Sequence, residues 1–211
     1  MAITTYSELQ TAVANWLDRT DLTSRIPEFI SLAELQLDRT LRARELISRA
    51  TATLNEEYEA LPNNFAEMQR LYITNTSPKI ELTGMAPTAL VQRYPATDAG
   101  RPVAYAIVGT ELQFAPKPDS TSTYTIELTY FSKVSALALS DSNTTNVVLD
   151  QHPDVYLYAA LLEGAKYLMD DRGIARWKPL RDEEILLANQ AAQDALTGGS
   201  LAMRHGMRGI A

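Results

Sequence analysis

The sequence predicts an α+β fold, with a helical bundle built from N- and C-terminal helices and an inserted antiparallel β-sheet or sandwich region. Apolar residues recur at helical spacing near both ends of the 211-residue chain. Between these ends, short segments rich in Ile, Thr, Tyr and Val are separated by Pro, Gly and Asn, as strands are separated by turns. The length suffices for one domain or two small ones.

Residues 1–44 predict a helical hairpin. Thr5 and Glu8 have the spacing of a capping box, so the first helix is expected at about residues 6–18. After a polar turn, Pro27 suits the first position of a second helix. The expected buried residues are Leu9, Val13, Trp16 and Leu17 in the first helix, and Ile26, Phe29, Ile30, Ala33, Leu37 and Leu41 in the second.

Residues 45–135 predict the inserted β-rich region. Gly109 and Thr110 join two of its segments as a hairpin would. Residues 86–96 predict one or two helical turns instead of a strand. The segments with strand composition are 45–55, 67–75, 79–84, 102–108, 111–116 and 123–133.

Residues 136–197 predict the C-terminal helices of the bundle. A polar linker over 136–151 precedes a helix that starts at Pro153, where the missing N–H costs nothing. The sequence DDRG at 170–173 is expected to break this helix before a last one over about 174–196. The residues expected to be buried there are Ile174, Trp177, Leu180, Ile185, Ala188, Ala192 and Leu196.

The segment 155–169 is apolar or aromatic at almost every position, so as a helix it has no wet face. It is either the central helix of the chain's own core or a helix partly enclosed by the β region or by another chain. Gly164 indicates close approach of a neighbour, because glycine costs about 1 kcal/mol relative to alanine in a helix. Three tyrosines add apolar rings with polar tips, which are typical of partly wet interfaces, at Tyr156, Tyr158 and Tyr167.

Residues that carry common enzyme chemistry are scarce. The sequence has no cysteine, so it predicts no disulfide and no thiolate site, and it has two histidines. His152 precedes Pro153, where a helix cap is the plainer interpretation, and His205 lies in a glycine-rich segment. We therefore expect no enzyme activity, metal or cofactor. Adjacent acids on a helix point about 100° apart and do not converge on a substrate, which applies to Asp170, Asp171, Glu183 and Glu184.

The formal net charge of −7 argues against a protein that coats DNA non-specifically. Four arginines nevertheless cluster near the second helix, where they either complement the helix dipole or bind an anionic partner. Arg39 and Arg42 are expected on one helix face, since they are three residues apart. A DNA-binding module that uses Arg39, Arg42, Arg44 and Arg49 remains the alternative function. Neither a signal peptide nor a membrane span is indicated, so cytoplasmic synthesis is expected.

Three stretches of the sequence resemble head-to-tail adaptor (connector) proteins of tailed bacteriophages, especially the short-tailed type. They are residues 6–42, residues 61–73 (LPNNFAEMQRLYI) and above all residues 149–171 (LDQHPDVYLYAALLEGAKYLMDD). The resemblance implies a structural virion protein in the neck between head and tail, made in the host cytoplasm. Such adaptors assemble, usually as twelve copies, into a ring below the portal that extends the DNA channel and receives tail tube or nozzle proteins.

The resemblance also implies roles for residues. The glycine-rich segment 198–211, expected to be flexible, would bind the portal protein through Leu201, Met203, Arg204, Met207, Arg208 and Ile210. Contacts between subunits are expected on the helices at 153–171 and 27–42, with Tyr156, Tyr158, Leu162, Gly164, Phe29 and Leu37 as candidate residues. DNA would pass through the channel without specific binding, because an acidic lumen repels it.

Overall fold

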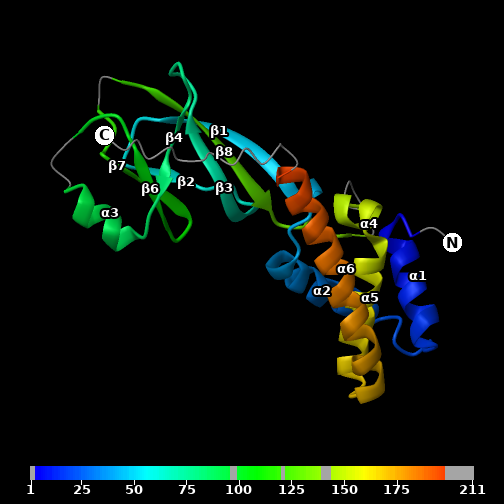
Figure 1. The fold of residues 1–211 in the computed structure, drawn as a ribbon. Helices are drawn as coiled ribbons and strands as arrows, with labels where there is room; N and C mark the ends of the chain where they lie inside the picture. Colours follow the sequence, from blue (N-terminus) through cyan, green and yellow to red (C-terminus); the bar gives the residue numbers. More distant parts are fainter. Residues whose placement is uncertain (1–2, 96–98, 120–121, 139–143, 198–211) are drawn as a thin grey trace, which may run out of the picture. The chain divides into compact units, whose positions relative to one another are not determined.

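The computed structural model describes residues 3–95, 99–119, 122–138 and 144–197 (Figure 1). The chain forms two compact units, Leu46–Val134 and Met1–Glu45 together with Ser135–Ala211. We call them the β unit and the helical unit. Most helices lie in one unit, and both sheets lie in the other together with one short helix, so the predicted α+β class is confirmed.

Helix α1 (Tyr6–Leu17) begins with the predicted capping box. The Glu8 N–H donates to Thr5 Oγ1 at 3.3 Å, and the Thr5 N–H donates to Glu8 Oε2 at 3.0 Å, so two N–H groups at the helix start are satisfied. The buried face comprises Tyr6, Leu9 and Val13. Trp16 was predicted to be buried with them but is 50% exposed, because it lies on the edge of that face.

Helix α2 (Ile26–Thr40) starts as predicted, with Pro27 in its first turn. Its apolar stripe is buried, and Glu34 is buried on the same face. The helix ends at Thr40, since Leu41 has an extended backbone. Leu41 is nevertheless buried, so the predicted stripe continues one residue beyond the helix. A short 3-10 helix, Arg44–Leu46, then leads to the β unit.

The predicted linker 136–151 contains a helix that sequence reasoning missed, α4 (Val147–Gln151). Asn146 caps it, because its Oδ1 accepts the Leu149 N–H at 2.8 Å. Helix α5 (Pro153–Tyr167) follows after His152. Polar composition hid α4, whose Val148 and Leu149 are fully buried.

Helix α6 (Asp171–Thr197) starts three residues earlier than predicted and contains Pro179. The break lies at Met169, which has a positive φ of 53°, and at Asp170. Asp170 Oδ1 accepts the Arg172 N–H at 3.1 Å, as a helix cap does. Gly173 is buried in the first turn of this helix. A Cβ there would lie 3.0 Å from the Cβ of Ala165 on α5, so the glycine allows the two helices to approach closely.

The β unit contains two four-stranded sheets. One has the order β1-β8-β3-β4, formed by Ile47–Leu54, Tyr124–Ser132, Phe65–Ile73 and Ile80–Glu81. The other has the order β2-β7-β6-β5, formed by Tyr58–Ala60, Glu111–Ala115, Ala104–Val108 and Thr83–Gly84. Apolar residues of both sheets, such as Leu71, Phe114 and Ile126, form one core.

The β unit departs from the sequence prediction at its edges. Strand β2 was missed because only three residues form it, with Glu59 in the middle. The expected strand 79–84 is two short strands, and the second of them, β5, pairs with β6 in parallel. The predicted hairpin at Gly109 is present, and Gly109 has the positive φ of 63° that such a turn requires. Helix α3 (Pro87–Arg93) fills the predicted helical turns.

Candidate functional site

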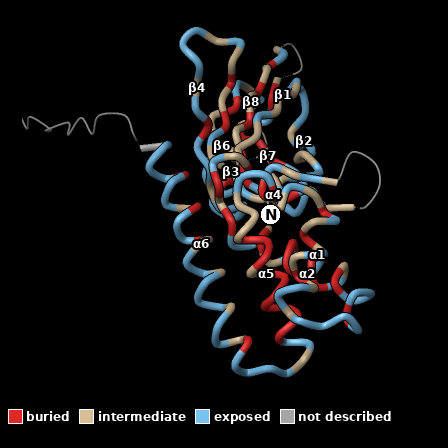
Figure 2. The backbone as a smooth tube through the Cα atoms, turned by 90° about the vertical axis from the view of Figure 1, so that its right-hand side faces the viewer, coloured by how far each residue is buried: buried red, intermediate tan, exposed pale blue. Residues whose placement is uncertain are grey.

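Helix α5 is enclosed on most sides by helices of its own chain. Ten of its fifteen residues are buried, whereas most of α6 is exposed (Figure 2). Helices α1, α2, α4 and α6 all pack against α5. The apolar circumference that raised the possibility of a second chain is therefore the centre of the helical unit.

The residues predicted for subunit contacts lie mostly in this core. Tyr156 is 0% exposed, and three more are buried with it: Leu162, Phe29 and Leu37. Gly164 lets two neighbours approach α5, since a Cβ there would lie 3.1 Å from Leu17 Cδ1 and 3.5 Å from Phe29 Cδ2. In this conformation these side chains are covered by their own chain, and the subunit contact predicted on them stays a prediction.

Tyr158 is the exception among the predicted contact residues. Its ring stacks on Trp177 of α6 at a centroid distance of 6.2 Å and meets Trp16 of α1 at 6.2 Å. The ring centroids of Trp16 and Trp177 are 5.6 Å apart, and the Arg176 guanidinium lies over the Trp177 ring. Three helices thus share an aromatic cluster whose outer member, Trp16, is half exposed.

Two outer helix faces carry exposed leucines. On α2, Leu32 and Leu35 are 42% and 54% exposed, on the side opposite the buried stripe. On α6, Leu180 and Leu187 are seven residues apart and therefore share a face, and Leu187 is 52% exposed. Leu180 was predicted to be buried but is also exposed. These leucines are part of the apolar surface that the helical unit leaves uncovered, together with Trp16, Val147, Tyr167, Met169 and Leu186.

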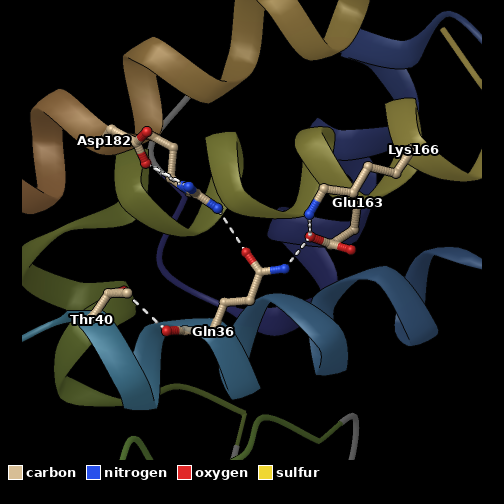
Figure 3. Close-up of polar contacts among 6 residues, drawn as sticks. Gln36, Thr40, Glu163, Lys166 and Asp182 are labelled. Carbon is tan, nitrogen blue, oxygen red and sulfur yellow. Dashed lines mark hydrogen bonds and ion pairs between the residues drawn. The ribbon is translucent and has the colours of Figure 1, made fainter. Parts of the chain in front are cut away.

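A polar network fixes the position of α2 and α6 around α5 (Figure 3). Glu163 of α5 is only 8% exposed and accepts hydrogen bonds from Gln36 Nε2 and from Lys166 Nζ. Arg181 of α6 donates to Gln36 Oε1 at 2.7 Å and also contacts Asp182. The Gln36 amide of α2 thus contacts both Glu163 of α5 and Arg181 of α6. It positions three helices and is not a free binding group.

A second buried network anchors the chain where it returns from the β unit. Glu34 Oε1 accepts the Leu137 N–H at 2.9 Å and the Tyr156 hydroxyl at 3.1 Å. Asn146 Nδ2 donates to that hydroxyl oxygen at 2.7 Å. Burial raises the pKa of Glu34, and burial together with the Glu34 charge raises the pKa of Tyr156. These groups hold the core together and face no open site.

The arginine cluster does not form one surface. Because α2 ends at Thr40, Arg39 and Arg42 do not share a helix face as predicted. The Arg42 guanidinium donates to the backbone oxygens of Asp38 and Leu41 and so caps the helix end. Asn189 of α6 completes this cap, because it accepts the Arg42 N–H at 2.6 Å and donates to the Thr40 oxygen at 3.0 Å.

The other two arginines belong to different surroundings. Arg44 forms an ion pair with Glu45 at 3.3 Å in the helical unit. Arg49 lies on β1 of the β unit and forms an ion pair with Glu127 of β8 at 3.4 Å. The cluster is therefore distributed over a helix cap, a connection and a strand, and the geometry does not favour the DNA-binding alternative.

His152 stands at the start of α5, but its side chain caps no helix N–H. Its Nε2 lies 3.6 Å from Glu45 Oε2. Nearby, burial and the Asp154 carboxylate raise the pKa of Glu184. Among the residues that the structure describes, no group of three or more His, Asp or Glu side chains is arranged to hold a metal ion. The predicted portal-binding residues and His205 lie in 198–211, outside the described residues.

A family model described as SU10 adaptor protein matches residues 4–204, nearly the whole chain. The chain belongs to this family. It is a bacteriophage adaptor protein, as the resemblance of residues 149–171 indicated, and therefore a structural component of the virion that interacts with portal and tail proteins. A comparison with curated proteins gives no match. Within the described parts of the adaptor, no helix has both the length and the hydropathy of a membrane span.

Proposed function

We propose that this adaptor forms a ring below the portal, extends the DNA channel and provides the platform to which tail proteins attach. Twelve copies would make up the ring. The observation that carries the proposal is the contrast between the closed core around α5 and the leucines left exposed on α2 and α6. A helical unit that already buries its central helix needs no second chain to fold, so its outer leucines are available for assembly.

The subunit contact in this proposal joins two different faces. The outer face of α2, with Leu32 and Leu35, meets the outer face of α6, with Leu180 and Leu187, of the next copy. A contact between two unlike patches is head-to-tail, and head-to-tail contacts generate rings when the rotation closes. A contact of one patch with itself would give only dimers. Trp16, the exposed member of the aromatic cluster, lies on a third helix, α1, and is left for other partners.

Attachment to the portal is assigned to residues 198–211. The segment follows α6 directly, contains spaced apolar and basic side chains, and at about 3.3 Å per residue can extend for roughly 45 Å. The loops of the β unit would face the tail proteins. The formal net charge of −7 suits a conduit through which DNA moves without sticking.

Sedimentation of the full chain with the portal protein of the same phage tests this function. We expect the chain to join portal particles at one copy per portal subunit, and a chain without residues 198–211 to fold but not to attach. If the shortened chain still attaches to the portal, the assignment of portal binding to residues 198–211 is wrong. Absence of any association between the intact chain and the portal would contradict the proposed function as a whole.

A further inference from the structure

Among the described residues, one edge strand of the β unit is long, whereas the other three edge strands are short. The edge strands β2, β4 and β5 have three, two and two residues, which leaves little backbone to pair with another chain. Strand β1 has eight residues, pairs with β8 on one side along its whole length, and contains no proline. Half of the N–H and C=O groups of such a strand point away from its sheet.

An apolar cleft runs beside this edge. It has a volume of about 170 Å³ and lies between β1 of one sheet and β2 of the other. From β1, the small side chains of Ala50 and Ala52 line it and are only partly buried. The other residues that line it are Thr51, Glu59, Ala60, Leu61, Pro62, Leu112, Ile126 and Leu128. A strand added to β1 would place every second side chain in this cleft.

Most segments of this protein are too short to add as a strand along the whole of β1. Among the described edge strands, only β1 exceeds three residues. Strand β3 is paired with β4 only at Tyr72 and Ile73, but register shifts interrupt the rest of it, so it does not offer a regular edge along eight residues. Of the segments outside the described residues, only 198–211 is longer than β1. This segment has two arginines and no acidic residue in a chain of net charge −7, so residues 1–197 carry −9.

The sequence of that segment also alternates as a strand does. Leu201, Met203, His205 and Met207 stand at every second position, with Ala202, Arg204, Gly206 and Arg208 between them. In an extended conformation the first four share one face, which matches an apolar cleft that contains one acidic residue, Glu59. The second four would face solvent. The pattern fits strand addition and does not depend on the contact proposed between α2 and α6.

We propose that residues 201–208 of one copy add as an extra strand to the free edge of β1 in a second copy, with Leu201 and Met203 in the cleft. The same residues are assigned above to the portal, so one copy of the segment cannot do both. Portal binding would therefore withdraw the segment from β1. Free copies would associate through strand addition, and copies on the portal would not.

Hydrogen exchange and sedimentation of the full chain test this proposal, in a Leu35→Asp background that suppresses the proposed helical contact. We expect residues 47–54 to become more protected as concentration rises. A synthetic peptide of residues 198–211 should lower the average mass. Met203→Asp should weaken association about tenfold, because a buried methionine is lost. The matched Ala202→Asp, with the same charge change on the other face, should have an effect of about threefold or less.

Three results would overturn the proposal. Exchange at residues 47–54 that does not depend on concentration would show that no second copy covers β1. Equal effects of Met203→Asp and Ala202→Asp would show that the segment does not bind as a strand with one buried face. A mass that saturates at two copies, with no effect of the peptide, would show that two β1 edges pair with each other instead.

Discussion

Helices α5 and α6 pack against each other in the helical unit but differ in how much of their surface is buried. Helix α5 is apolar around its circumference and is covered by four helices of the same chain. Helix α6 is nearly twice as long, has charged or polar side chains at 13 of its 27 positions, and buries one face that includes Ile185, Ala188 and Ala192. The comparison shows that the most apolar helix of this adaptor forms its core, and that the partly exposed helix keeps apolar residues on its surface, to which the proposed assembly contact is assigned.

The largest expected effect is a difference in stability between two leucine-to-aspartate variants, one in α5 and one in α6. Leu161→Asp places a charge in the fully buried centre of α5 and should lower the free energy of unfolding by about 4 kcal/mol or more. Leu187→Asp on the exposed face of α6 should change it by about 0.5 kcal/mol or less. Urea denaturation of both variants measures this difference. Similar losses in the two variants would contradict the distinction between core and assembly surface.

A second prediction concerns how closely α5 is packed. Gly164→Leu should lower the free energy of unfolding by about 2–3 kcal/mol, because even a Cβ at this position contacts Leu17 and Phe29. Ala175→Leu, on the exposed side of α6, is the matched control and should be nearly neutral. Thermal unfolding of the two variants gives the comparison. A neutral Gly164→Leu would mean that α1 and α2 do not approach α5 as described.

A smaller effect is expected where α6 holds the end of α2. Asn189→Ala removes the hydrogen bonds to the Arg42 N–H and the Thr40 oxygen and should cost about 1 kcal/mol of stability. Gln190→Ala, the exposed neighbour, should cost less than half as much. Equal stabilities of the two variants in denaturant titrations would argue against this cap.

The smallest effect appears only as a dependence on pH. Burial raises the pKa of Glu34 above its usual value of 4.5. The carboxyl group of the unfolded chain loses its proton near pH 4.5, whereas that of the folded protein keeps it up to its raised pKa. Between these two pKa values the free energy of unfolding therefore decreases as pH rises. Glu34→Gln should flatten this decrease, whereas Glu28→Gln, on the exposed side of α2, should leave it unchanged. An unaltered pH profile for Glu34→Gln would contradict the assignment.

The helices and strands with strong local signals could be predicted from sequence. The capping box at Thr5 and Glu8, and Pro27 and Pro153 in first turns, act within a few residues, so the helix starts follow from them. Helix α4 and strand β2 escaped prediction because each is five residues or fewer and is held by distant partners. The start of α6 depends on the Asp170 cap, which the acidic and glycine-containing sequence DDRG conceals.

The candidate assembly surface was harder to predict, for a physical reason. Hydrophobicity identifies residues that avoid water, but it does not say whether the same chain or another chain covers them. Tyr156 and Leu162 were therefore assigned to a subunit contact although four helices of one chain enclose them. The exposed Leu35 and Leu187 lie on helices with ordinary amphipathic patterns, so only the packing around α5 distinguishes them.

Binding isotherms on isolated portal particles test the central claim most directly. Copies of the intact adaptor that contact each other through α2 and α6 should bind cooperatively and reach one copy per portal subunit. Leu35→Asp should keep attachment through residues 198–211 but bind without cooperativity and about tenfold more weakly, while its unfolding transition stays unchanged. Identical, steep isotherms for the two proteins would contradict the claim that the exposed face of α2 joins one subunit to the next.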